Sequence, residues 1–252
     1  MDKPFVKQVV LDGVSTITFS NPSHNALPSL LLSKLETEIV LAANNTAVRV
    51  VVLQSGGDRT FCAGASFNEL IAIETETQGE MFFSGFAKVI NAMRKCPKFI
   101  VCKVQGKAVG GGLGISAAAD YCLATQYASI KLSELSIGIG PFVIEPAVSR
   151  KIGVAAMSEM AINAEQFYNA EWAKQKGLYA EVFETKADMQ DAAEALAQKL
   201  KTYNPEAVKA MKTVMWDNTS HWDSLLAERA KISGTLVLSR FTKDVLQKYK
   251  TT

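Results

Sequence analysis

The chain has 252 residues, of which 48% are apolar and 21% are charged, and these ordinary values exclude a disordered or fibrous protein. Its 27 Lys and Arg residues nearly balance 25 Asp and Glu residues, so the net charge of +2 gives no indication of a nucleic-acid partner. The four cysteines lack a C-x-x-C spacing, and neither a secretory signal nor a long uncharged span is present. We therefore expect a cytoplasmic protein with reduced thiols and no membrane segment.

Residues 1–135 alternate short apolar runs with segments of helical periodicity. The predicted strands are residues 5–10, 14–19, 48–53, 99–104, 121–124 and 129–132. The predicted helices are residues 28–43, 78–93 and 115–119. This alternation predicts an α/β protein in which helices cover β-sheets.

After Pro146 the pattern becomes helical almost throughout. The predicted helical segments are residues 147–152, 155–162, 169–176, 187–200, 205–217 and 222–249. No linker rich in Pro, Gly or Ser separates the two halves. We therefore expect the helical half to pack on the sheet or on a neighbouring subunit.

Several kinds of catalytic site are unsupported. His24 and His221 are the only histidines, too few for a histidine-based zinc site, so no metal is expected. The G-x-S-x-G nucleophile motif and the Walker phosphate-binding motif are both absent.

The most unusual local composition is the glycine run at residues 110–114. Glycines between a strand and a helix permit a tight backbone crossing, and they also leave the first N–H groups of the helix free to bind an anion. Residues 112–117 (GLGISA), with Glu134 downstream, fit a loose dinucleotide-binding motif. Alternatively, the run is half of an oxyanion hole, with the small-residue loop 60–66 (TFCAGAS) supplying a second backbone donor.

Four motifs in register resemble the enoyl-CoA hydratase/isomerase (crotonase) superfamily. They are residues 61–65 (FCAGA), 106–112 (GKAVGGG), 133–138 (SELSIG) and 173–178 (AKQKGL). The opening segment 21–27 (NPSHNAL) resembles the CoA-side loop of that family. Four motifs in the expected order favour the oxyanion hole over the dinucleotide site.

The resemblance implies a spiral of β-β-α units that forms two nearly perpendicular sheets. It implies an acyl-CoA-binding core over residues 1–190 and a C-terminal helical oligomerisation region over residues 191–252, in a homotrimer or in a hexamer built as a dimer of trimers. It also implies that the N–H groups of Ala65 and Gly111 hold a thioester enolate and that Glu134 transfers protons. No cofactor is implied, because CoA enters as part of the substrate.

One departure from the family pattern concerns the reaction type. Hydratases of this family commonly pair two glutamates around a water, and Gly114 stands where the first is expected. A single carboxylate suffices for a Δ3,Δ2-enoyl-CoA isomerase, so the chemistry alone favours isomerisation. Residues 111–114 and 132–134, however, resemble bacterial methylglutaconyl-CoA hydratases of leucine breakdown, which favours hydration. A non-catalytic acyl-CoA-binding protein is a further alternative. Decarboxylation also stays open, because the same oxyanion hole would stabilise the enolate that forms when CO2 leaves.

Further side chains are assigned by the resemblance or by position. Glu145 is a possible second acid within an apolar run, although it also fits a helix start, and we expect a structural role for Asp120. The aromatic residues Phe82, Phe83 and Phe86 could line the acyl chamber or pack in the core. The expected substrate- and CoA-binding residues are Asn25, Ala26, Leu27, Ala63, Gly64, Ser66, Gly110, Phe241 and Lys248.

Overall fold

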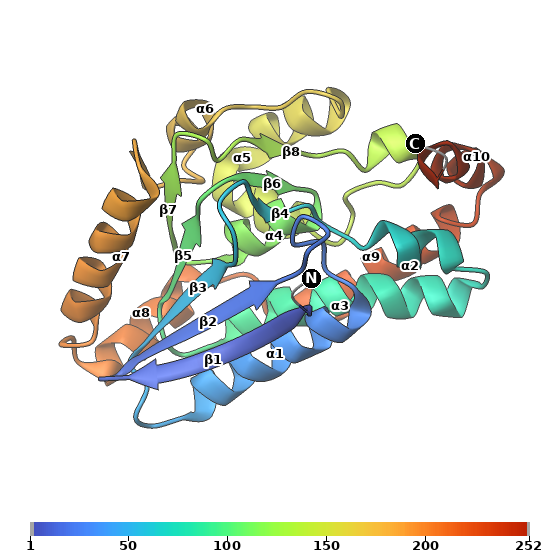
Figure 1. The fold of residues 1–252 in the computed structure, drawn as a ribbon. Coiled ribbons are helices and arrows are strands. Elements are labelled where there is room, and N and C mark those ends of the chain that lie inside the picture. Colours follow the sequence, from blue (N-terminus) through green and yellow to red (C-terminus); the bar gives the residue numbers. More distant parts are fainter. Residues whose placement is uncertain (1–2, 251–252) are drawn as a thin grey trace.

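Two β-sheets organise the molecule (Figure 1). The computed structural model describes residues 3–250, with side chains up to residue 248. In spatial order, the six strands of the larger sheet are β1 (Phe5–Leu11), β2 (Val14–Ser20), β3 (Val50–Ser55), β5 (Ile100–Val104), β7 (Tyr121–Thr125) and β9 (Glu181–Phe183). The β1–β2 hairpin is antiparallel, and every other neighbouring pair in this sheet is parallel.

The smaller sheet positions the candidate site. Its strands, in spatial order, are β4 (Thr60–Cys62), β6 (Lys107–Val109) and β8 (Ile130–Lys131), and they are parallel. The chain enters each of them from a strand of the larger sheet, through β3, β5 and β7 in turn. Because parallel strands end at the same edge of a sheet, the segments that follow β4, β6 and β8 lie together. These segments contain Ala65, Gly111 and Glu134.

Helices cover both faces of the larger sheet (Figure 1). The helical elements are α1 (Ser29–Asn44), α2 (Phe67–Ala72), α3 (Glu76–Lys95), α4 (Gly111–Ala118), the 3-10 turn η1 (Leu135–Ile137), α5 (Glu145–Ile162), α6 (Ala170–Gln175), α7 (Lys186–Leu200), α8 (Pro205–Met215), α9 (Trp222–Leu236) and α10 (Arg240–Lys250). Among the residues described, no helix is both long enough and apolar enough to cross a bilayer.

Strand β3 shows why its sequence is a continuous apolar run. Val51 and Leu53 belong to the core beneath α1 and α3, whereas Val50 and Val52 pack with Met189 on α7. Successive side chains of a strand point to opposite faces, so a strand covered on both faces needs apolar residues at every position. The predicted boundary at residue 190 falls inside α7, the helix that makes this second layer.

The predicted α/β alternation is confirmed, with differences at particular elements. The predicted stretch 222–249 forms two helices, because the chain turns at the fully buried Val237 and the Ser239 hydroxyl accepts a hydrogen bond from the N–H of Thr242 (3.3 Å). The break between the predicted helices 147–152 and 155–162 is present as a kink in α5 at Gly153, whose φ of 82° is left-handed. The sequence patterns missed the short elements β4, α2, β6 and β9.

Helices α3 and α9 cross at a pair of glycines. A Cβ atom added to Gly79 would lie 2.7 Å from both the Cα and the carbonyl oxygen of Gly234. A Cβ atom on Gly234 would lie 2.6 Å from the backbone nitrogen of Glu80. The two backbones therefore touch, and α9 lies close to the part of α3 that contains Phe82, Phe83 and Phe86.

A buried ion pair connects α8 to the larger sheet. Lys212 Nζ lies 2.7 Å from Asp120 Oδ2, and each side chain is only 3% exposed. The same carboxylate accepts hydrogen bonds from the N–H of Ile100 (2.8 Å) and from the indole N–H of Trp216 (3.1 Å). Lys212 also donates to the carbonyl oxygen of Lys98 (2.9 Å), so both charges are partnered. Asp120 thus has the structural surroundings expected for it.

Candidate active site

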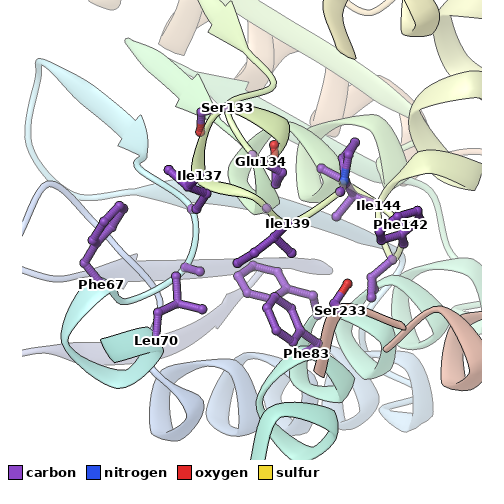
Figure 2. Close-up of a pocket in the computed structure, with 18 of the residues that line it drawn as sticks. Phe67, Leu70, Phe83, Ser133, Glu134, Ile137, Ile139, Phe142, Ile144 and Ser233 are labelled. Carbon is purple, nitrogen blue, oxygen red and sulfur yellow. The ribbon is translucent and has the colours of Figure 1, made fainter. Parts of the chain in front are cut away.

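A cavity lies where the segments after β4, β6 and β8 meet helices α2, α3 and α9 (Figure 2). It holds about 590 Å³ of empty space, counting the solvent at its mouth. Its wall includes the backbone of residues 63–65 and 110–111, the side chain of Glu134 and a majority of apolar side chains. The three positions that the sequence assigned to catalysis, Ala65, Gly111 and Glu134, all line it.

The loop after β4 is fixed by the segment that precedes α1. Leu27 and Ala65 form a parallel bridge, in which the N–H of Leu27 donates to Gly64 (2.8 Å) and the N–H of Ser66 donates to Leu27 (3.3 Å). These bonds use the groups on either side of Ala65 but leave its own N–H without an acceptor in the described chain. Ser66 is the N-cap of α2, and its hydroxyl accepts a hydrogen bond from the N–H of Glu69 (3.4 Å). The N–H of Ala65 is therefore available to a ligand.

The second backbone donor is the first residue of α4. The N–H of Gly110 donates to Lys131 (2.9 Å), whereas that of Gly111, within residues 3–250, has no acceptor. A free N–H at a helix N-terminus also carries the positive end of the helix dipole. Gly64 brings the two loops together, because a Cβ atom there would lie only 2.8 Å from the carbonyl oxygen of Val109 and 3.4 Å from the nitrogen of Gly111.

Glu134 follows β8 and precedes the turn η1. Its Oε2 atom is buried and has no hydrogen-bond partner in the part of the chain that the structure describes. A Cβ atom added to Gly110 would lie 2.5 Å from Oε1, so the carboxyl group sits directly against the glycine loop. Burial raises the pKa of Glu134 from its ordinary value of 4.5 to about 7, although the backbone amides of Glu134 and Ser133 oppose the shift. This group can both accept and return a proton near neutral pH.

The place of the missing glutamate is filled by an apolar side chain. A Cβ atom added to Gly114 would lie 2.4 Å from Cγ2 and 2.6 Å from Cβ of Ile144, which is 4% exposed and lines the cavity. Any larger residue at position 114 therefore requires Ile144 to move. Gly114 and Ile144 form one steric unit, although they are far apart in the sequence.

Glu145 does not lie in the cavity wall. It is the first residue of α5, and its Oε1 atom accepts a hydrogen bond from the hydroxyl of Ser149 (2.6 Å), one helical turn away. The position is the helix start that the sequence also allowed, and the structure does not bring this carboxylate together with Glu134 in the cavity wall.

The residues expected to bind substrate and CoA fall into three sets. Ala63, Gly64 and Gly110 line the cavity, and Ser66 caps the adjacent helix. Leu27 is fully buried, Ala26 is partly exposed, and the side chain of Asn25 is occupied by hydrogen bonds with Gly56 (2.7 Å) and Thr60 (2.8 Å). Phe241 and Lys248 lie on α10 and do not line the cavity.

Phe241 lies near the site because it packs against Gly138, in the segment of the same chain that follows Glu134. Its side chain is 63% exposed, and a Cβ atom on Gly138 would lie 2.6 Å from its Cδ1 atom. Helix α10 therefore packs on the segment that follows Glu134.

Sequence patterns missed several wall residues. Phe83 and Phe86 line the cavity as considered, whereas Phe82 packs in the neighbouring core cluster with Leu70. Ile139 and Phe142 lie in an irregular segment that gives no periodic signal, and the periodicity of the helix that carries Ser233 does not indicate that this helix reaches the cavity. No group of three or more His, Cys, Asp or Glu side chains that could hold a metal occurs in residues 3–248.

Known proteins share this sequence and fold. The family model for enoyl-CoA hydratase/isomerase matches residues 10–248. A probable enoyl-CoA hydratase of Bacillus subtilis (strain 168) is 26% identical over 238 residues, covering 94% of this chain and 92% of the relative. A peroxisomal Delta(3,5)-Delta(2,4)-dienoyl-CoA isomerase of Arabidopsis thaliana is 27% identical over 215 residues, covering 79% of this chain and 76% of the relative.

A solved structure confirms the predicted crotonase-like fold. The enoyl-CoA hydratase from Bacillus halodurans superposes with a TM-score of 0.90 at 20% identity, covering 96% of this chain and 99% of the other. The family match extends over nearly the whole chain and includes every residue of the site described above. The chain therefore belongs to the enoyl-CoA hydratase/isomerase family.

Proposed function

We propose that this protein is an enoyl-CoA hydratase, which adds water to the 2,3 double bond of an unsaturated acyl-CoA thioester. The observation that carries the proposal is the buried, unpartnered Oε2 atom of Glu134, in the same cavity wall as the backbone of Ala65 and Gly111. Within residues 3–250 the N–H groups of Ala65 and Gly111 also lack acceptors. A proton-transferring carboxyl beside two free donors is what an enolate intermediate requires.

The proposed reaction uses Glu134 twice. The thioester oxygen accepts hydrogen bonds from the N–H groups of Ala65 and Gly111. The Glu134 carboxylate takes a proton from water, the water oxygen bonds to C3, and the electrons of the double bond move onto the thioester oxygen. Glu134 then returns the proton to C2, which gives a 3-hydroxyacyl thioester and restores the carboxylate. One such backbone donor contributes on the order of 3 kcal/mol to transition-state stabilisation.

A single carboxyl balances this reaction, because the proton taken from water is the proton delivered to C2. The name of the Bacillus subtilis relative supports hydration. The resemblance implies fatty-acid or branched-chain (leucine) degradation, and of these two settings we propose fatty-acid degradation for this activity. The proposed assembly is a homotrimer or a dimer of trimers.

Isomerisation is the second candidate, and the contact between Gly114 and Ile144 favours it. In the described chain Glu134 is the only carboxylate in the cavity wall, and Ile144 fills the space of a side chain at position 114. An isomerase would take a proton from C2 of a 3-enoyl thioester and return it to C4. This needs one base and no water, and the Arabidopsis relative is named as an isomerase.

Incubation with enoyl-CoA thioesters in 18O-labelled water separates the two reactions. Label in a 3-hydroxyacyl-CoA supports hydration, whereas conversion of a 3-enoyl to a 2-enoyl thioester without label supports isomerisation. Glu134→Gln should abolish turnover but keep acyl-CoA binding, with the exposed Glu165→Gln as the matched control. Binding without turnover of any thioester in the unmodified protein would indicate a non-catalytic acyl-CoA-binding protein. Glu145→Gln tests the second-acid hypothesis, since full turnover excludes it.

A further inference from the structure

The wall of the cavity is apolar apart from its catalytic edge. Phe67 and Leu70 lie on one side of it and Phe142 and Ile144 on the other, with Ile139 and Phe83 between them (Figure 2). The polar side chains in the wall are Ser133, Glu134 and Ser233. No Lys, Arg or His side chain of the described residues lines the cavity.

Among the described residues, the cavity wall therefore contains one acidic side chain and no basic side chain. A carboxylate on the far end of an acyl chain would lose its water and find no cation to pair with. It would also approach Glu134, whose carboxyl must ionise during the reaction, and like charges repel strongly in a buried site. The hydroxyl of Ser233 is a single neutral group and does not replace a cation.

The part of the wall beside the glycine run also favours a neutral acyl chain over one that carries a carboxylate. Ile144 fills the position in front of Gly114, so the wall presents methyl groups where an acidic or hydrated side chain would otherwise stand. Helix α9 lies close to the cavity because Gly79 and Gly234 touch, and this places the buried Ser233 in the wall. An apolar chain gains by burial against such a surface, and a charged end does not.

We propose that this cavity selects neutral, apolar acyl chains and rejects acyl-CoA thioesters that carry a distal carboxylate, methylglutaconyl-CoA among them. Ile144 and Phe142 are the specificity-determining residues. The inference rests on the proposed function in taking acyl-CoA as the ligand, but it concerns the acyl end alone. It departs from the leucine-pathway substrate class that the sequence resemblance favours.

A matched pair of saturated thioesters tests the proposal without any turnover. Hexanoyl-CoA and adipyl-CoA have six acyl carbons each and differ at the far end, a methyl group against a carboxylate. Isothermal titration of the unmodified protein should give a dissociation constant at least about 100-fold weaker for adipyl-CoA. Equal affinities would overturn the proposal and leave hydration untouched.

A lysine in the wall should reverse part of this preference. Phe142 is partly exposed, so Phe142→Lys can place an ammonium group near the cavity mouth, and we expect the ratio of the two constants to narrow by about tenfold or more. Phe142→Leu is the matched control and should keep the ratio of the unmodified protein. The unmodified protein alone decides the proposal if the lysine variant does not fold.

Turnover of the corresponding enoyl thioesters distinguishes the two proposals. We expect 2-hexenoyl-CoA to be hydrated and 2,3-dehydroadipyl-CoA to react at least about 100-fold more slowly in kcat/KM. Preferential binding of hexanoyl-CoA without hydration of 2-hexenoyl-CoA would reject the hydratase and support the selectivity. Failure to bind either saturated thioester would reject both.

Discussion

The pKa of Glu134 lies near neutral because the carboxyl group is buried and its Oε2 atom has no hydrogen-bond partner in the described chain. Most glutamates lie in water, where their pKa stays near the ordinary value. Here no cation of the described residues lies in the cavity wall, so burial is the dominant effect on the pKa of Glu134. The same absence underlies the proposed rejection of acidic acyl chains.

The pH dependence of turnover follows from this pKa. Hydration needs ionised Glu134 in the free enzyme, so kcat/KM should fall about tenfold for each pH unit below about 7 and level off above it. The measurement is kcat/KM for an enoyl thioester between pH 5 and 9. A midpoint of the pH profile close to 4.5 would show that water solvates the Glu134 carboxyl group in the free enzyme, and it would contradict the raised pKa.

The contact between Gly114 and Ile144 predicts energetic coupling. Gly114→Ala should cost about 1–3 kcal/mol, because the new methyl group would lie 2.4 Å from Ile144 Cγ2. In the background of Ile144→Gly that penalty should largely disappear, since both clashing atoms, Cγ2 at 2.4 Å and Cβ at 2.6 Å, are gone. Denaturant unfolding of the two single variants and the double variant measures the coupling, and strict additivity would show that the two positions are independent.

The sequence predicted one half of this contact and not the other. Gly114 was noticeable because a motif placed it where a glutamate is expected, and Glu134 and the two glycine loops were identified in the same way. Ile144 lies in an irregular segment with no pattern to predict its direction. Glu145 was a candidate for its carboxyl group alone, and the structure shows that group outside the cavity wall, bonded to Ser149.

At the scale of elements, the crossing of α3 and α9 depends on two backbones in contact. Gly79→Ala should destabilise the protein by about 1–3 kcal/mol, because its methyl group would meet the backbone of Gly234, which cannot rotate away. Gly85→Ala on the same helix is the matched control, since its methyl group meets a movable Leu32 side chain at 2.9 Å. Thermal unfolding compares the two variants, and equal melting temperatures would contradict the crossing.

Elements with strong periodicity were predictable, and short elements were not. The apolar spacing of Leu31, Leu35 and Ile39 predicted α1, and all three side chains are buried. Strands β4 and β6 have three residues each, too few for any period to show, and tertiary pairing alone defines them. Strands β4 and β6 therefore became visible only in three dimensions, although they help to determine where the site forms, whereas β8 lies within the predicted strand 129–132.

At the scale of the whole molecule, the Asp120–Lys212 pair connects the helical half to the sheet. Lys212→Met should cost about 3–5 kcal/mol, because it leaves a buried carboxylate without its cation. The double variant Asp120→Asn, Lys212→Met should recover part of this loss. Lys186→Met is the matched control, since its partner Asp58 is 82% exposed and water replaces the lysine. Chemical denaturation measures all three, and a small effect of Lys212→Met would contradict the role of the pair.

Glu134 also makes global stability depend on pH. Its pKa is raised on folding, so the folded protein binds more protons between pH 4.5 and about 7, and stability falls as pH rises through that window. Glu134→Gln removes this cost and should be more stable than the unmodified protein by about 3 kcal/mol at pH 8, with little difference below pH 4.5. Unfolding free energies at the two pH values test this, and a variant less stable at pH 8 would contradict it.

The two proposed enolate donors are parts of the main chain, and this affects how such a site can change over generations. A point mutation elsewhere in the cavity wall replaces a side chain and leaves the N–H groups of Ala65 and Gly111 in place. Gly111 itself is constrained, because a Cβ atom there would lie 2.2 Å from Phe86 Cε1. Substitutions at Gly114, Glu134, Phe142 or Ile144 can therefore change the proton-transferring group, the access of water or the acyl chain that the cavity accepts. The two backbone donors stay in place. Such a fold can acquire new reactions over generations without first losing the backbone N–H groups that stabilise the enolate.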